Sequence, residues 1–180
     1  MKMGEREADA DGALDGVPGL EPTDRRYHPW LRRLGICAML AVVGLALANV
    51  FGQRPETTTA RGAGASLSVS SPATLRGGLL FTSRFTVLAR RALPKPVLVL
   101  APGWFQQMTL NAIAPNPNQE SSRNGAVSYT FDPLGAGRRL VVWISWQANP
   151  TNLTHRSENV ELADGTTPIV LVRRSLTVFP

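Results

Sequence analysis

The sequence predicts an all-β protein: an immunoglobulin-like antiparallel β-sandwich preceded by one N-terminal transmembrane α-helix. Eighteen consecutive residues, 34–51, carry no charged side chain, which is close to the minimum length for crossing a membrane core. From Ser66 onward, short runs of β-forming residues alternate with turn residues, and no segment has a helical period. A small β-barrel is the alternative architecture.

The first 24 residues predict a disordered acidic tail. They are rich in Gly, Ala, Asp and Glu and have no periodic apolar face. Burial of so few apolar groups does not offset the entropy lost when a chain is ordered. We therefore divide the chain into this cytoplasmic tail (1–24), a basic flank with the transmembrane helix (25–52), a linker (53–65) and an extracytoplasmic β-sandwich domain (66–180).

Arginines on the two sides of the apolar segment predict its orientation. Four arginines precede the segment, namely Arg25, Arg26, Arg32 and Arg33, and two follow it, Arg54 and Arg61. Positive charge is retained on the cytoplasmic side, so the N-terminus is expected inside and the C-terminal domain outside the plasma membrane. The alternative is a signal peptide cleaved after Ala48, because Ala46-Leu47-Ala48 matches a small-residue cleavage site. Both interpretations export the C-terminal domain.

The exported domain is expected to contain seven or eight strands. Alternation is clearest in 79–89, where Phe81, Phe85 and Val87 share one face. Prolines at both ends of 96–102 predict an edge strand or a strand terminus, and Asp164-Gly165 predicts a hairpin turn. The expected strands lie in SLSVS, LLFTSRFTVLA, PVLVLAP, MTLNAIA, the two halves of AVSYTFDPLGAGRRLVVWISWQANP, NVELADG and PIVLVRRSLTVFP.

The residue content argues against several kinds of active site. Cys37 is the only cysteine, so neither an intrachain disulfide nor a cysteine metal site is expected. His155 is the only histidine of the exported domain, which leaves no histidine cluster for zinc and a single candidate base for a serine nucleophile. The acids of this domain form no calcium-loop pattern. We therefore expect no enzyme activity, no metal, no cofactor and no small-molecule substrate.

The basic charge has no pattern that points to nucleic acid. The formal net charge is +6, but no dense basic run or aromatic-interleaved patch carries it. Two pairs remain, Arg138-Arg139 and Arg173-Arg174. Neighbours on a strand point to opposite faces, so one arginine of each pair is expected to lean toward the rim of the core. We interpret the pairs as solvated edge charge, with binding to lipid headgroups or an anionic partner as the alternative.

Trp143 is the strongest candidate for a binding contact. The even-numbered residues from Leu140 to Ala148 of its predicted strand are all apolar, so Trp143 and Val141 lie on the opposite, wet face and would form an apolar spot there. Trp104 and Phe105 offer a second candidate spot on a loop. Exposed aromatic side chains are common anchors at interfaces. The alternative is that a loop or an arginine side chain covers Trp143.

Three segments carry a resemblance to known proteins: SYTFDPLGAGRRLVVWISWQANPTN, RSENVELADG and the C-terminal RSLTVFP. They resemble single-pass bacterial membrane proteins with a short cytoplasmic tail, one N-terminal helix and an exported immunoglobulin-like domain akin to CARDB and related adhesion-type repeats. The resemblance covers roughly residues 30–180. It is a pattern of strands and turns, so it carries over no active-site residue.

These observations predict a non-enzymatic, membrane-anchored extracytoplasmic interaction module. It would act as an accessory subunit that binds another membrane or envelope protein, with Trp143, Val141, Trp104 and Phe105 as contact residues. The alternative is a cell-wall polymer-binding or adhesion domain, in which exposed aromatic side chains pack against sugar rings.

Overall fold

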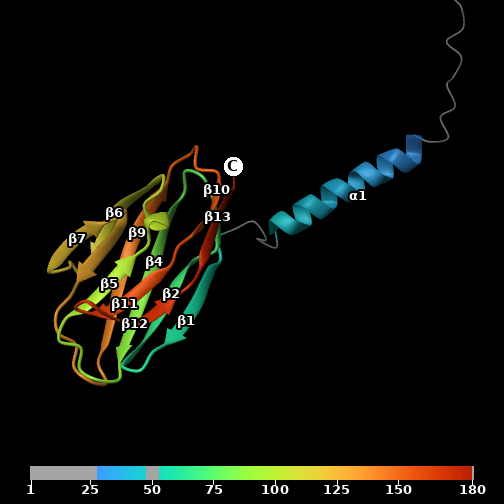
Figure 1. Cartoon of the computed structure of the whole chain (residues 1–180). Coiled ribbons are helices and arrows are strands. Elements are labelled where there is room, and N and C mark those ends of the chain that lie inside the picture. Colours follow the sequence, from blue (N-terminus) through green and yellow to red (C-terminus); the bar gives the residue numbers. More distant parts are fainter. Residues whose placement is uncertain (1–27, 48–52, 180) are drawn as a thin grey trace, which may run out of the picture. The chain divides into compact units, whose positions relative to one another are not determined.

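The computed structural model describes residues 28–47 and 53–179 and confirms an immunoglobulin-like antiparallel β-sandwich preceded by one helix (Figure 1). The chain divides into two compact units, Met1–Gly44 and Leu45–Pro180. The predicted acidic tail and the cleavage site at Ala48 lie outside the described residues and stay predictions.

The helix α1 (His28–Leu47) begins six residues before the uncharged segment and so includes Arg32 and Arg33. Pro29 suits the first turn, because its fixed φ matches a helix and its missing N–H would have no partner there. The described side chains of α1 are exposed, the large apolar ones included. By length and composition alone, the part from Pro29 to Leu47 could cross a membrane.

Thirteen strands form in the described part of the sandwich. Their bounds are β1 Pro55–Arg61, β2 Ala65–Pro72, β3 Thr74–Arg76, β4 Leu80–Ala89, β5 Pro96–Leu100, β6 Met108–Ala114, β7 Gln119–Arg123, β8 Ala126–Thr130, β9 Arg139–Ala148, β10 Thr154–Ser157, β11 Val160–Asp164, β12 Thr167–Val172 and β13 Ser175–Phe179. A short 3₁₀ helix, η1 (Pro102–Trp104), follows β5.

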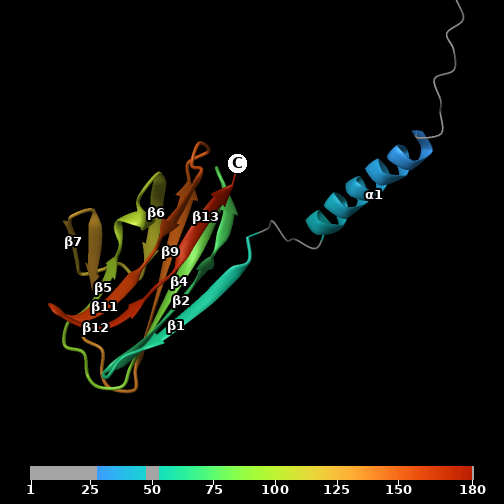
Figure 2. The same cartoon turned by 45° about the vertical axis from the view of Figure 1, so that its right-hand side comes forward.

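The strands form two five-stranded sheets and one three-stranded sheet. The large sheets have the orders β1-β2-β4-β9-β6 and β12-β11-β5-β8-β7, and the small sheet has the order β10-β13-β3. Every strand pair is antiparallel except β13 with β3. Figures 1 and 2 show β5, β11 and β12 in front of the sheet that contains β2, β4 and β9. We call the sheet that contains β4 and β9 the β4–β9 sheet.

The core lies between the layers and is built by strict alternation. On β4 the residues Phe81, Phe85 and Val87 are buried, as predicted, and the even-numbered residues between them face away from the core. On β9 the buried set is Val142, Ile144, Trp146 and Ala148. Register pairs Phe85 with Val142 and Phe81 with Trp146, so the two strands present one continuous apolar surface.

The predicted linker at 53–65 is wrong for most of its length. Residues 55–61 form β1, which pairs with β2 from Pro55 opposite Pro72 to Arg61 opposite Ser66. The segment is polar because it lies at the edge of its sheet and buries little. Its β-branched threonines favour an extended backbone even without an apolar face.

Two further strand predictions need correction. Of the two alternatives for the segment 96–102, the edge strand is wrong, because β5 lies in the middle of its sheet. The strand terminus is right for Pro96, which begins β5, whereas Pro102 begins η1. The segment PIVLVRRSLTVFP is two strands, because the chain passes from one sheet to another at Arg173 and Arg174.

Candidate functional site

The outer face of the β4–β9 sheet carries one large aromatic side chain, that of Trp143. Register places Arg84 of β4 directly opposite Trp143 of β9. The Arg84 Cζ lies 5.4 Å from the centre of the indole ring. A cation over an aromatic face is attracted by the ring quadrupole, by about 0.5–1 kcal/mol at an exposed site. The indole is therefore held by a neighbour but remains 46% exposed.

A shallow hollow of about 590 Å³ surrounds this pair. We call it the Trp143 hollow; its lining residues are Thr57, Ser68, Arg84, Thr86, Arg139, Val141 and Trp143. The described residues that line it include two arginines and three hydroxyl side chains and no acid. This combination offers an apolar surface, hydrogen-bonding groups and positive charge in one place.

The structure separates the four predicted contact residues into two pairs. Trp143 and the half-buried Val141 both line the hollow, where the sequence analysis expects them. Trp104 is completely buried and Phe105 is partly buried, so the expectation of an exposed aromatic spot on this loop is wrong for Trp104. Only the first pair forms one surface feature.

The short helix η1 is what turns Trp104 inward. The centre of the Trp104 ring lies 5.4 Å from that of Phe85 and 5.4 Å from that of Trp146. The Trp104 Nε1 donates a hydrogen bond to the Asn159 carbonyl at 3.3 Å. Gly103 permits this position, because a Cβ there would meet the Ser157 carbonyl oxygen at 1.9 Å. The Pro-Gly pair before the tryptophan is the sequence signal that could have indicated a tight, buried turn.

A buried charge cluster, which no sequence pattern predicts, lies beside Trp104. The Glu158 side chain is completely buried between two arginines. Its Oε1 lies 4.0 Å from Arg156 Nε, and its Oε2 lies 3.8 Å from Arg174 Nη1. The Arg174 Cζ also lies 5.3 Å from the centre of the Trp104 ring. Arg174 is the member of its pair that leans into the core, whereas Arg173 is exposed.

Arg174 also binds the backbone across the sandwich. Its Nη2 donates to the carbonyls of Ser71 at 3.2 Å and Pro72 at 2.7 Å, at the end of β2. Its backbone N–H donates to Asn159 Oδ1 at 3.3 Å. Arg174 therefore connects its own segment to the end of β2 and to the segment before β11, which are distant in sequence.

Burial dominates the electrostatics of this cluster. It raises the pKa of Glu158 to about 7, and the charges of Arg174 and Arg156 oppose that shift. It also lowers the pKa of both guanidinium groups, which nevertheless stay protonated at neutral pH. Neither carboxylate oxygen has a hydrogen-bond partner among the described residues. Because Glu158 is completely buried, a substrate cannot reach it in this conformation, and we assign the cluster a structural role.

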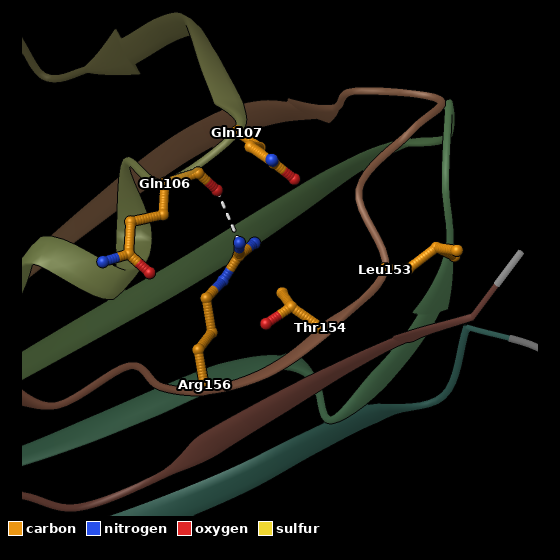
Figure 3. A pocket seen from close by; sticks show the side chains of 5 residues that line it. All are labelled: Gln106, Gln107, Leu153, Thr154 and Arg156. Carbon is orange, nitrogen blue, oxygen red and sulfur yellow. Dashed lines mark hydrogen bonds between the residues drawn. The ribbon is translucent and has the colours of Figure 1, made fainter.

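A second hollow, of about 440 Å³, opens beside Arg156 (Figure 3). Gln106, Gln107, Leu153, Thr154 and Arg156 line it. Figure 3 shows the Arg156 side chain reaching from β10 toward the Gln106 carbonyl, to which its Nη1 donates. The same Nη1 lies 3.4 Å from Asn152 Oδ1. Arg156 thus fastens the segment after η1 to the turn before β10.

The remaining polar candidates hold turns and strands. His155 lies on β10, and its Nδ1 lies 2.9 Å from Thr177 Oγ1. Asp164 accepts a hydrogen bond from the Lys95 N–H at 2.9 Å, and Asp132 accepts one from Asn118 Nδ2 at 2.6 Å. Within residues 28–47 and 53–179, no group of three or more His, Cys, Asp or Glu side chains is placed to hold a metal ion.

Comparison with known proteins gives matches among solved structures alone: no family model and no curated protein matches the chain. The chain is similar to the CARDB domain of a Pyrococcus furiosus protein solved in complex with di-metal ions, with 14% identity, 72% of this chain and 91% of that chain covered, and a TM-score of 0.42. The solution structure of the same domain gives 15% identity, 70% and 96% coverage and a TM-score of 0.40. AvmM, which catalyses macrocyclization in alchivemycin A biosynthesis, gives 9% identity, 64% and 88% coverage and a TM-score of 0.44. Likenesses this distant assign neither ligand nor activity.

Proposed function

We propose that this chain is a non-enzymatic, membrane-anchored module of a bacterial envelope, which binds another membrane or envelope protein through the Trp143 hollow. The observation that carries the proposal is the 46% exposure of a tryptophan in the middle of a regular sheet. The rest of the face around it is mostly Ser, Thr and Arg. A large aromatic side chain on such a surface is typical of an interface anchor.

The helix α1 supplies the anchor in this proposal. Its apolar side chains are exposed around the helix, which costs free energy in water and suits the interior of a bilayer. The four arginines that precede the apolar stretch favour a cytoplasmic N-terminus. The sandwich would then lie on the outer side of the plasma membrane.

The chemistry of the hollow narrows the kind of partner. Arg84 and Arg139 line it and no described lining residue is acidic, so an acidic patch around an apolar centre complements it. Charges of this kind mainly speed the encounter and select the partner, whereas the buried aromatic side chain supplies most of the affinity.

Photo-crosslinking in living membranes tests this proposal. A photo-reactive residue replaces Trp143 in the full-length chain, and matched probes replace Ser145 on the same face and the exposed Leu171 on the other large sheet. An adduct with one defined envelope protein at position 143, absent at position 171, supports the proposal. Equal adducts at 143 and 171, or none at 143, contradict it.

The variant Trp143→Arg provides the second arm. It removes the indole and adds a third cation to the hollow, so we expect loss of the crosslinked partner in co-purification while the sandwich stays folded. If this variant unfolds, Trp143 has a role in the core and the proposal is wrong.

The alternative function is binding to a cell-wall polymer. The hydroxyl groups of Thr57, Ser68 and Thr86 beside an exposed indole are a combination that also suits sugar rings. Sedimentation of the protein with purified cell wall tests it: wall binding that Trp143→Arg abolishes would favour the alternative over a protein partner.

A further inference from the structure

Exposed apolar side chains of the sandwich are concentrated at one end. Seven large apolar residues are exposed among its described residues: Leu79, Leu80, Leu88, Trp143, Leu153, Leu171 and Phe179. Four of these seven, Leu79, Leu80, Leu153 and Phe179, belong to turns or strand ends that meet at the same place. We call these four residues the apolar end. Single exposed leucines are common on proteins, but a concentration of this kind calls for an explanation.

Backbone contacts bring the apolar end together. The Gly77 N–H donates to the Phe179 carbonyl at 2.9 Å, and the Leu79 carbonyl accepts from the Ala148 N–H at 3.0 Å. Leu153 directly precedes Thr154, which pairs with Val178 in the β10–β13 ladder, so Leu153 lies beside the end of β13. In Figure 3 Leu153 is seen in the connection that leads into β10.

The chain also enters the sandwich at this end. Gln53 Nε2 donates to the Leu80 carbonyl at 3.4 Å, which ties the first described residue of the sandwich to the apolar end. In Figures 1 and 2 the start of β1 and the end of β13 lie toward the same end of the sandwich.

Few residues separate the uncharged segment from this end in the sequence. That uncharged segment runs from Leu34 to Phe51, and Gln53 follows two residues later. Two residues of fully extended chain span about 7 Å. If the segment crosses the bilayer, Gln53 and the apolar end with it therefore start within about one headgroup layer of the hydrocarbon boundary.

Positive charge accompanies the apolar side chains. Arg54 follows Gln53 directly, and Arg76 pairs with Phe179 in the β3–β13 ladder; both arginines are exposed. Guanidinium groups match phosphate oxygens well, and apolar side chains flanked by cations are typical of surfaces that rest at a membrane interface.

We propose that the apolar end docks on the outer surface of the bilayer, with Leu79, Leu80, Leu153 and Phe179 in the boundary between headgroups and acyl chains. The inference rests on the membrane anchor of the proposed function but not on its protein partner. Trp143 pairs with Arg84, which lies four residues along β4 from Leu80. The Trp143 hollow would therefore lie about 13 Å from the docked end. A partner would then meet it close to the membrane.

Depth-dependent quenching in vesicles tests the docking. The full-length chain carries Cys37→Ala to remove its single cysteine, and then Leu80→Cys or Leu88→Cys labelled with a polarity-sensitive fluorophore. These two exposed leucines lie at opposite ends of β4, about 27 Å apart, so they are matched in residue type and strand. Vesicles contain phosphatidylcholine and phosphatidylglycerol with or without brominated acyl chains.

We expect brominated lipid to reduce the fluorescence of the probe at position 80 and to leave that at position 88 unchanged. A probe at Leu153→Cys is expected to behave like the one at position 80, which covers the case that Leu80→Cys does not fold. Equal responses at 80, 88 and 153 overturn the docking. The emission of the probe at position 80 can also shift to the blue as the protein-to-lipid ratio rises, without quenching by brominated lipid. That result indicates contact with a second copy of the chain and also overturns the docking.

Flotation of the same vesicles distinguishes a failure of the docking from a failure of the membrane anchor. Protein that floats with the vesicles but shows no quenching at 80 and 153 keeps its anchor and lacks the docking. Protein that does not float has no anchor, which overturns both the anchored module and the docking that rests on it.

Discussion

Glu158 and Arg174 are joined twice. The Glu158 N–H donates to the Arg174 carbonyl at 2.9 Å, and Arg174 Nη1 lies 3.8 Å from Glu158 Oε2. Glu158 lies between β10 and β11, and Arg174 lies between β12 and β13. At both places the chain passes between the small sheet and the same large sheet. The pair therefore fastens the two crossings to each other.

Arg174→Ala is expected to destabilise the sandwich strongly. It leaves Glu158 with less compensating charge, removes the hydrogen bonds to Ser71 and Pro72, and removes the packing on Trp104. Breaking a buried ion pair costs about 3–5 kcal/mol of unfolding free energy. Urea unfolding of the full chain in mild detergent, followed by tryptophan fluorescence, measures it.

The control for that variant is Arg173→Ala. Arg173 is its sequence neighbour but is exposed, so a change within about 0.5 kcal/mol is expected. Similar losses for the two variants would show that the buried contacts of Arg174 contribute little.

The stability of the sandwich should depend on pH through Glu158. Burial raises its pKa from 4.5 to about 7, so the folded chain holds an extra proton between these values. This contribution is fully present below about pH 4.5 and is lost as the pH rises through about 7. The free energy of unfolding should therefore fall from pH 5 to pH 8, and Glu158→Gln should reduce that slope. An unchanged slope in the variant would mean that the two arginines keep Glu158 ionised throughout.

Two tryptophans on one strand should differ in how much stability their truncation costs. Trp146 is completely buried and stacks on Trp104, so Trp146→Ala is expected to cost about 3–5 kcal/mol. Trp143→Ala removes an exposed ring and its contact with Arg84, for a cost of about 1 kcal/mol or less. Urea unfolding of both variants under the same conditions makes the comparison. A large loss for Trp143→Ala would count against a free outer face.

Gly103→Ala should disturb the position of Trp104. The added Cβ would lie 1.9 Å from the Ser157 carbonyl oxygen, so the backbone has to move. Overpacking of this kind costs about 1–3 kcal/mol. Near-ultraviolet circular dichroism would report the changed aromatic packing. Gly135→Ala is the control, since its Cβ would meet only the Arg138 side chain at 3.5 Å; an equal effect there would contradict the explanation.

Strands that bury one face could be predicted from the sequence. In β4, β8 and β9, period-two alternation identifies both the strand and its inward side, and the structure buries Val127, Tyr129 and Phe131 on one side of the chain. The strands that were missed, β1, β3, β7 and β10, are short or polar. In β7 every residue is exposed, because this strand lies at a sheet edge and is held by backbone pairing to β8.

The buried residues of the site could not be predicted in the same way. Glu158 is one of several acids in a polar stretch, and no local pattern shows that Arg156 of β10 and Arg174, which lies between β12 and β13, enclose it. The position of Trp104 likewise depends on η1 and on the close approach of the Ser157 backbone. Trp143 was recognisable because it breaks a local alternation, which needs no knowledge of the rest of the fold.

The alternation of β9 divides natural selection along a single strand. Substitutions at Val142, Ile144 and Trp146 would disturb the buried core, whereas the proposed partner surface would constrain those at Val141 and Trp143. Descendants of one ancestral gene could therefore exchange one partner for another through odd-numbered positions alone. Among such descendants, the pattern of variation along β9 would record the history of the partner separately from the history of the fold.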